Sequence, residues 1–184
     1  DHKTIEKAKE TADTLIKHNF KPFFCPQSVE GDIEGLIKSF FWAKNDPRIE
    51  IIGFSILAIP NAYGVLKDPL QRFLSRWRFI CELNKRGFFQ DNTKKLHLLG
   101  MLDGPNEIGL LKEFLSEFSS WDSSAAVWAG INGFVFDDSP TGMITGKYEK
   151  EVYFDHDTAD LTDIAFATKN LKYIDGMIDE VLRG

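Results

Sequence analysis

Cysteine is scarce in this chain of 184 residues, which contains only Cys25 and Cys81. Two thiols so far apart in the sequence make neither a disulfide framework nor a four-cysteine zinc site. No apolar run reaches the roughly 18 residues that a membrane-spanning helix needs. The first residues, Asp-His-Lys-Thr, are polar and have no signal-peptide pattern. These absences predict a cytoplasmic globular protein with reduced thiols and no membrane partner.

Several signatures of catalysis are also missing. The sequence contains no phosphate-binding loop, no GxGxxG fingerprint, no GxSxG nucleophile elbow and no HExxH zinc motif. No second histidine stands at metal-ligand spacing from His97, so we expect neither a metal nor another cofactor. The formal net charge of −6 argues against a broad basic surface and leaves only a local patch for nucleic acid.

Apolar runs and amphipathic segments alternate along the chain. Hydrophobic residues make up 43% of it and include 16 phenylalanines, enough for one substantial core. Helical spacing of apolar residues predicts helices over 4–18, 33–44, 69–85, 106–118 and 160–182. Apolar runs bounded by turn residues predict strands over 20–25, 49–58, 95–101 and 125–136, with a further short strand over 147–155. Residues 59–64 are interpreted as a loop.

This alternation predicts an α/β fold, in which parallel strands are joined by helices through right-handed crossovers. We expect one domain, residues 1–184, whose strands form a small open sheet or a partial or complete TIM-like (β/α)8 barrel. The chain does not begin with Met, so we expect it to be the C-terminal part of a longer barrel protein. A half barrel exposes apolar strand edges, which a missing N-terminal half or a partner chain would cover.

Polar side chains follow three of the predicted strands. They are Gln27, Asn61, Asp103 and Asn106. Because the carboxyl ends of parallel strands share one edge of a sheet, these residues could converge on one rim. The alternative is that they only solvate their loops.

Asp122 is the strongest single candidate for chemistry, placed between Trp121 and Ser123 at the start of the predicted fourth strand. A partly desolvated carboxylate beside an indole can act as a nucleophile or general base. The alternative is a turn aspartate bonded to nearby backbone. His97, flanked by leucines, is either a catalyst or a structural histidine of its strand. His156 is interpreted as part of a solvated loop.

Three segments together carry a family resemblance. They are Phe23-Phe-Cys-Pro-Gln27, the run from Gly53 to Ile59, and the stretch from Leu98 through Pro105-Asn-Glu107 to Trp121-Asp122. Over roughly residues 20–135 the chain resembles the C-terminal half of the tRNA-guanine transglycosylase barrel, especially its divergent relatives that insert 7-deazaguanines into DNA. The resemblance implies a base-exchanging glycosyltransferase that acts on a purine-type base in DNA or tRNA.

The resemblance also implies a role for particular residues. Gln27 would bind the base, Leu57 and Ala58 would line its pocket, Leu99 would pack on its face, Gly100 would leave room for it, and Asp122 would attack the anomeric carbon of the sugar. Such an exchange needs a nucleophile that holds the sugar while one base leaves and another enters.

Departures from the family pattern motivate an alternative. Leu57 and Ala58 stand where the family has a pair of glycines, and no cysteine follows Cys81 to form the family's zinc motif. A second catalytic aspartate would lie in the N-terminal half of such a barrel, outside this chain. The alternative is therefore a non-catalytic barrel-type subunit or interaction module that pairs with another chain.

Two further hypotheses stay open. Asp103 and Asp122 could form the acid pair of another barrel enzyme, acting on a small sugar or nucleotide. A local contact with phosphates is expected on the helix over 69–85, where Arg72 and Arg76 stand four residues apart and would share a face. Ion pairing within the chain is the alternative for these arginines.

Overall fold

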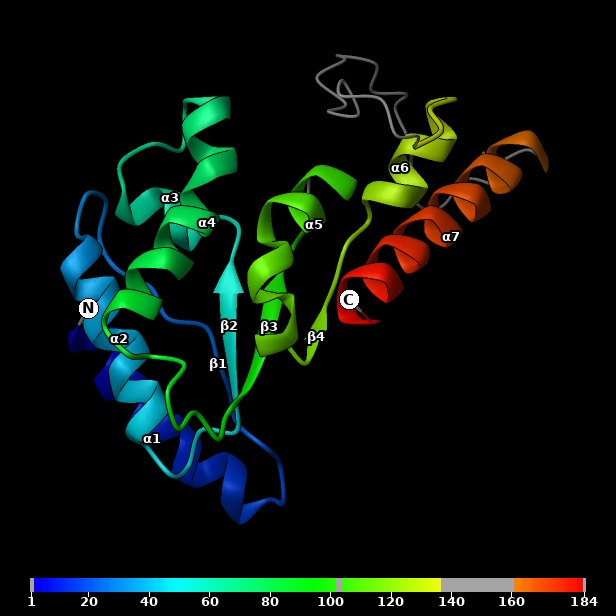
Figure 1. Cartoon of the computed structure of the whole chain (residues 1–184). Coiled ribbons are helices and arrows are strands. Elements are labelled where there is room, and N and C mark those ends of the chain that lie inside the picture. Colours follow the sequence, from blue (N-terminus) through cyan, green and yellow to red (C-terminus); the bar gives the residue numbers. More distant parts are fainter. Residues whose placement is uncertain (1, 102–103, 137–160, 184) are drawn as a thin grey trace. The chain divides into compact units, whose positions relative to one another are not determined.

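The computed structural model describes residues 2–101, 104–136 and 161–183 (Figure 1). The chain divides into two compact units, of which the first holds residues 1–100 and 116–122 and the second holds residues 101–115 and 123–184. The first unit contains a four-stranded parallel sheet with helices, which confirms the predicted α/β fold at that level. No helix within the described ranges is both long and apolar enough to cross a membrane.

The strands follow one another across the sheet in chain order (Figure 1). They are β1 (Phe23–Phe24), β2 (Ile51–Ser55), β3 (Lys95–Leu99) and β4 (Ser120–Trp121), and all pairs are parallel. The register places Gly53 beside His97 and His97 beside Ser120. Side chains in register point to the same side of a sheet, so these three positions lie on one face.

The opposite face of the sheet forms the core of the first unit. Phe54 of β2 packs edge-to-face against Phe40 of α2 (Ile33–Asn45), with ring centroids 4.6 Å apart. Phe40 also contacts Phe79 of α4 (Pro69–Lys85) at 4.9 Å and Phe88 at 5.8 Å. All four rings are fully buried, so much of the predicted phenylalanine core is one cluster between the sheet and these two helices.

Local capping sets where these helices begin. The carboxylate of Asp32 accepts a hydrogen bond from the Gly35 N–H, and that of Asp68 accepts one from the Gln71 N–H. Pro69 occupies the first turn of α4, where a backbone N–H is not needed. Both helices therefore begin where the sequence predicts, because the signals lie within one turn of each start.

Residues 58–62 form a short helix, α3 (Ala58–Ala62), where the sequence predicts a loop. The Ser55 hydroxyl accepts hydrogen bonds from the N–H groups of Leu57 and Ala58, at 3.2 and 3.1 Å. Pro60 falls within the first turn, where its missing N–H costs no hydrogen bond. The predicted loop is therefore wrong for residues 59–62, which form a helical turn that tolerates Pro60.

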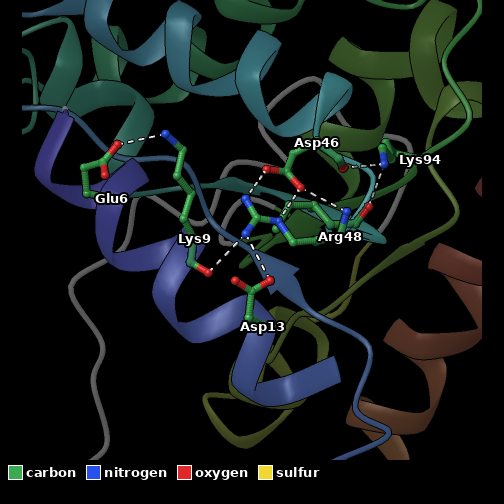
Figure 2. Close-up of polar contacts among 7 residues, drawn as sticks. Glu6, Lys9, Asp13, Asp46, Arg48 and Lys94 are labelled. Carbon is green, nitrogen blue, oxygen red and sulfur yellow. Dashed lines mark hydrogen bonds and ion pairs between the residues drawn. The ribbon is translucent and has the colours of Figure 1, made fainter. Parts of the chain in front are cut away.

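Arg48 attaches helix α1 (His2–Lys17) to the rest of the first unit (Figure 2). Its guanidinium donates to the Lys9 carbonyl at 3.3 Å and to the Asp13 carboxylate at 3.1 Å. On its other side it donates to both carboxylate oxygens of Asp46, at 2.9 and 2.6 Å. The Lys94 ammonium donates to the Asp46 carbonyl at 2.8 Å. This network joins α1 to the segments that precede β2 and β3.

The second unit is helical within its described residues. It contains α5 (Pro105–Leu111), α6 (Ala125–Ile131) and α7 (Leu161–Arg183). A Cβ at Gly130 would lie 2.4 Å from the Ala167 amide nitrogen, so glycine allows α6 and α7 to pack closely. The buried amide of Asn170 donates to the carbonyls of Ala126 and Phe134 and accepts from the Phe136 N–H.

The predicted strand over 125–136 is wrong, because residues 125–131 form helix α6 and the fourth strand is β4. An apolar run cannot by itself distinguish a buried strand from a helix, and alanine is the strongest helix former. The Ser123 hydroxyl accepts a hydrogen bond from the Ala125 N–H at the start of the helix. Asp122 therefore follows a strand instead of preceding one.

Two other predicted elements differ. The helix predicted over 106–118 is α-helical only to Leu111 and continues as the 3₁₀ helix η1 (Lys112–Glu117). The predicted strand over 147–155 lies outside the described residues.

Candidate functional site

Asp122 lies at the carboxyl end of β4, where its backbone N–H donates to the Leu98 carbonyl of β3 at 3.3 Å. Its Oδ1 atom accepts a hydrogen bond from the Gly100 N–H at 3.1 Å and lies 2.8 Å from Nε2 of His97. The Asp122 side chain is 56% exposed, whereas that of His97 is 17% exposed. The structure thus brings together three residues that the sequence marked separately.

The contact with Asp122 determines which ring nitrogen of a neutral His97 carries the proton. A carboxylate can only accept, so Nε2 of His97 carries the proton that is shared with Asp122. In the neutral ring, Nδ1 is then an acceptor, and it lies 2.8 Å from Oγ of Ser120. In this neutral tautomer the Ser120 hydroxyl donates to His97, and His97 donates to Asp122. Ser120, His97 and Asp122 thus form a chain of two hydrogen bonds that ends at Oδ1 of the carboxylate.

Phe23 and Gly53 determine what lies beside the imidazole. The Phe23 ring contacts the His97 ring edge-on, with centroids 5.7 Å apart. A Cβ at Gly53 would lie 2.6 Å from the Phe23 ring, so only glycine at this position of β2 lets that ring lie across the strand. The aromatic contact partly covers His97 while Ser120 and Asp122 stay exposed.

The segment after β3 is held from two directions. Gly100 has a φ of +70°, and a Cβ there would lie 2.9 Å from Cγ2 of Ile56, so glycine suits the position on both counts. Arg76 of α4 is 1% exposed and donates to the carbonyls of Leu99 and Gly100, at 3.3 and 2.5 Å. These contacts fix the peptide N–H that reaches Asp122.

The predicted phosphate-binding face of α4 is wrong for Arg76, because that side chain is buried against β3. It therefore does not share an exposed surface with Arg72. Arg78 lies over the Tyr63 ring at 4.7 Å, and Arg86 forms ion pairs with two glutamates at 2.7 and 2.8 Å. Arg86 thus shows the ion pairing within the chain that was the alternative interpretation, whereas Arg76 binds backbone carbonyls and Arg78 lies over an aromatic ring.

The remaining residues of the implied base pocket lie on the loops that follow β1 and β2. Gln27 is exposed, Leu57 is 58% exposed as the residue before α3, and Ala58 is the first residue of α3. Leu99 is the last residue of β3 and precedes Gly100. Leu99 and Gly100 thus adjoin Asp122 along the sheet edge, and a joint base pocket with Gln27, Leu57 and Ala58 stays a prediction.

Other candidates have different places. The Asn61 amide donates to the Ser28 carbonyl at 3.2 Å and so holds the loop after β1. Asn106 belongs to α5 of the second unit, and Asp103 and His156 lie outside the described residues. Burial raises the pKa of the Cys25 thiol, which is hydrogen-bonded to Ser55.

Sequence reasoning missed Ser120. Alternate residues of a strand point to the same face, so Ser120 and Asp122 would have been paired had the strand been placed one segment earlier. The clue was the position of Ser120, two residues before a candidate acid.

The cluster offers a fixed, partly exposed carboxylate with an oriented histidine, a combination that suits nucleophilic or acid–base chemistry. Within the described part of the chain, no group of three or more His, Cys, Asp or Glu side chains could hold a metal ion. Comparisons with protein-family models, with curated proteins and with solved structures found no match to this chain.

Proposed function

We propose that this chain supplies Asp122 as the nucleophile of a base-exchanging glycosyltransferase that acts on a purine-type base in nucleic acid. One observation carries the proposal. The Asp122 carboxylate lies at the carboxyl end of a parallel strand, with one oxygen bound by two donors and more than half of the side chain exposed. Covalent catalysis needs a carboxylate that is both fixed and within reach of its substrate.

The two carboxylate oxygens differ in a way that suits this role. Oδ1 has both hydrogen bonds, whereas Oδ2 accepts none within the described residues. Oδ2 is therefore the oxygen that attacks the anomeric carbon as the bond to the departing base breaks. An incoming base of the 7-deazaguanine type then displaces the carboxylate. The exposed ring of Phe23 offers an apolar surface near the same site.

The sheet supports placing this chain in a barrel. Sequential parallel order is the order of strands in a (β/α)8 barrel, whose active sites lie at the carboxyl ends of the strands. We infer that the face with His97 and Ser120 lines the interior of a TIM-like barrel to which this chain contributes four strands.

The test uses the full-length protein with DNA and, separately, with tRNA, each together with a labelled 7-deazaguanine base. Asp122→Asn is expected to lower incorporation of label at least about a thousandfold, because it removes the nucleophile. Asp91→Asn is the matched control, since Asp91 is exposed, precedes β3 and has a φ of +53°, which asparagine tolerates. The proposal fails if the wild type incorporates no label from either reaction, or if Asp122→Asn keeps the wild-type rate.

A second candidate function is that of a non-catalytic subunit that pairs with another barrel-type chain. The favouring observation is the His97 face of the sheet, on which Phe23 is 44% exposed and Lys95 and Ser120 are exposed. Parallel sheets are normally covered on both faces. Phe23→Asp should abolish association in sedimentation experiments, and Phe20→Asp, which changes a 64% exposed ring outside the strands, should leave it intact. A wild-type protein that stays monomeric and binds no second chain would exclude this candidate.

A further inference from the structure

We propose that His97 is a positioning residue that makes the Asp122 carboxylate a good leaving group in the second half of the exchange. This inference rests on the proposed function and adds to it a residue that controls release of the covalent intermediate. Its basis is that the two hydrogen bonds to the Asp122 carboxylate are both made to the same oxygen. His97 and the Gly100 N–H both bind Oδ1, at 2.8 and 3.1 Å, and leave Oδ2 to the sugar.

The first step forms the intermediate. An electron pair of Oδ2 forms a bond to the anomeric carbon, while the bond from that carbon to the base nitrogen breaks. The departing base keeps the electron pair of the broken bond and takes a proton from water, which leaves hydroxide. Asp122 is now a glycosyl ester in which Oδ1 is the carbonyl oxygen. An ester carbonyl bears less negative charge than a carboxylate, so the donors on Oδ1 bind it less strongly.

The second step restores the carboxylate. A nitrogen of the incoming base attacks the anomeric carbon and loses its proton to water, and the electron pair of the bond to Oδ2 returns to Asp122. Negative charge then grows on the carboxylate, where His97 and Gly100 stabilise it. Donors that bind developing charge lower the barrier of the step that produces it. Hydrogen bonds to Oδ1 therefore favour release over accumulation of the ester.

Two neighbouring residues, Ser120 and Phe23, orient the imidazole of His97. Oγ of Ser120 lies 2.8 Å from Nδ1, and a hydroxyl that donates to Nδ1 favours the tautomer whose proton lies on Nε2, toward Asp122. The Phe23 ring meets the imidazole edge-on. A histidine held on both sides loses little freedom when it donates, which is what a positioning residue requires.

The kinetic test separates the two steps. The full-length protein is incubated with nucleic acid and no added base, the protein–nucleic acid adduct is measured on denaturing gels, and a 7-deazaguanine base is then added to discharge it. His97→Phe keeps a ring beside Phe23 but has no donor. It is expected to slow discharge of the adduct about tenfold or more, with a smaller effect on its formation.

His97→Gln is the conservative control, because its amide can donate to Oδ1. It should discharge the adduct at close to the wild-type rate. Equal discharge rates for the wild type and His97→Phe would overturn the proposal. It would also be overturned if His97→Gln were as slow as His97→Phe, because hydrogen bonding would then not be the property that matters.

A second measurement needs no substrate. Nitrogen-15 spectra of the imidazole report which ring nitrogen carries the proton. The wild type should have the proton of the neutral ring on Nε2, and Ser120→Ala and Asp122→Ala should each weaken that preference. A proton on Nδ1 in the wild type would overturn the proposal. Absence of any adduct from a wild type with the expected tautomer would instead count against the proposed function.

Discussion

The two faces of the sheet differ in almost every respect, although they alternate along the same strands. One face carries Phe54, Leu96 and Leu98, all fully buried, and Phe54 packs against the aromatic cluster of α2 and α4. The other carries Gly53 and His97 and is linked by hydrogen bonds to exposed side chains. His97 thus lies between two core leucines in β3 but on the opposite face of the sheet. The strands use every second residue for stability, and the residues between them are available for chemistry.

The largest expected effect on stability comes from truncating one phenylalanine ring on each face of the sheet. Phe54→Ala should lower the free energy of unfolding by about 3–5 kcal/mol, because it leaves a cavity among buried rings. Phe23→Ala on the opposite face should cost less than about 1 kcal/mol, since that ring is 44% exposed. Urea denaturation measures both values. A loss for Phe23→Ala as large as that for Phe54→Ala would mean that the second face is covered as well.

Two glycines with the same φ angle give a smaller and more local test. Gly64 and Gly100 both have a φ of +70°, but only at Gly100 would a Cβ meet another residue, namely Ile56. Each change to alanine should cost about 1–2 kcal/mol for the left-handed backbone. Gly100→Ala should cost more by urea denaturation and should also disturb the N–H bound to Asp122. Equal costs at the two positions would show that Ile56 yields without strain and that the Gly100 contact is unimportant to folding.

The smallest effect is expected in acid, and it should belong to neither face. Hydrogen bonding to the Arg48 guanidinium holds the pKa of Asp46 below its ordinary value. The stabilisation is therefore present above the unfolded pKa of about 3.9 and is lost as the pH falls through the lower folded pKa. Asp46→Asn should cost on the order of 1 kcal/mol at neutral pH.

Urea denaturation curves between about pH 6 and pH 2.5 measure how the free energy of unfolding depends on the charge of Asp46. The gap between the wild type and Asp46→Asn should narrow below about pH 4, where Asp46 begins to bind a proton in the unfolded chain while the native carboxylate, with its lower pKa, stays charged. A gap of constant size would contradict the assignment to Asp46.

Features that depend on neighbours in the sequence could be predicted well. The bounds of α4, 69–85, match the prediction because an aspartate cap, a first-turn proline and Gly87 all act within a few residues. The parallel sheet followed from the spacing of apolar runs. The single domain and the barrel stay predictions.

Features that depend on tertiary contacts could not be predicted. Nothing around Arg76 in the sequence distinguishes it from Arg72, yet its guanidinium is buried against the end of β3. The bond between His97 and Asp122 depends on the register of β3 with β4, and β4 was hidden because the alanine-rich run after it has the hydrophobicity of a strand. Asp122 was predicted from its place beside Trp121 and Gly100 through the family resemblance, whereas Ser120 was identified only in the structure.

The unequal lengths of the strand pairings affect which part of the sheet unfolds locally first. β2 and β3 pair over five residues in the middle of the sheet, whereas β4 pairs with β3 over two at its edge. Short edge pairings open at a lower free energy than central ones, so amide hydrogens of β4 should exchange with solvent before those of β3. Each such opening separates Asp122 from His97 without unfolding the aromatic core. Asp122 and His97 would then be hydrogen-bonded only for the fraction of time that β4 is paired with β3.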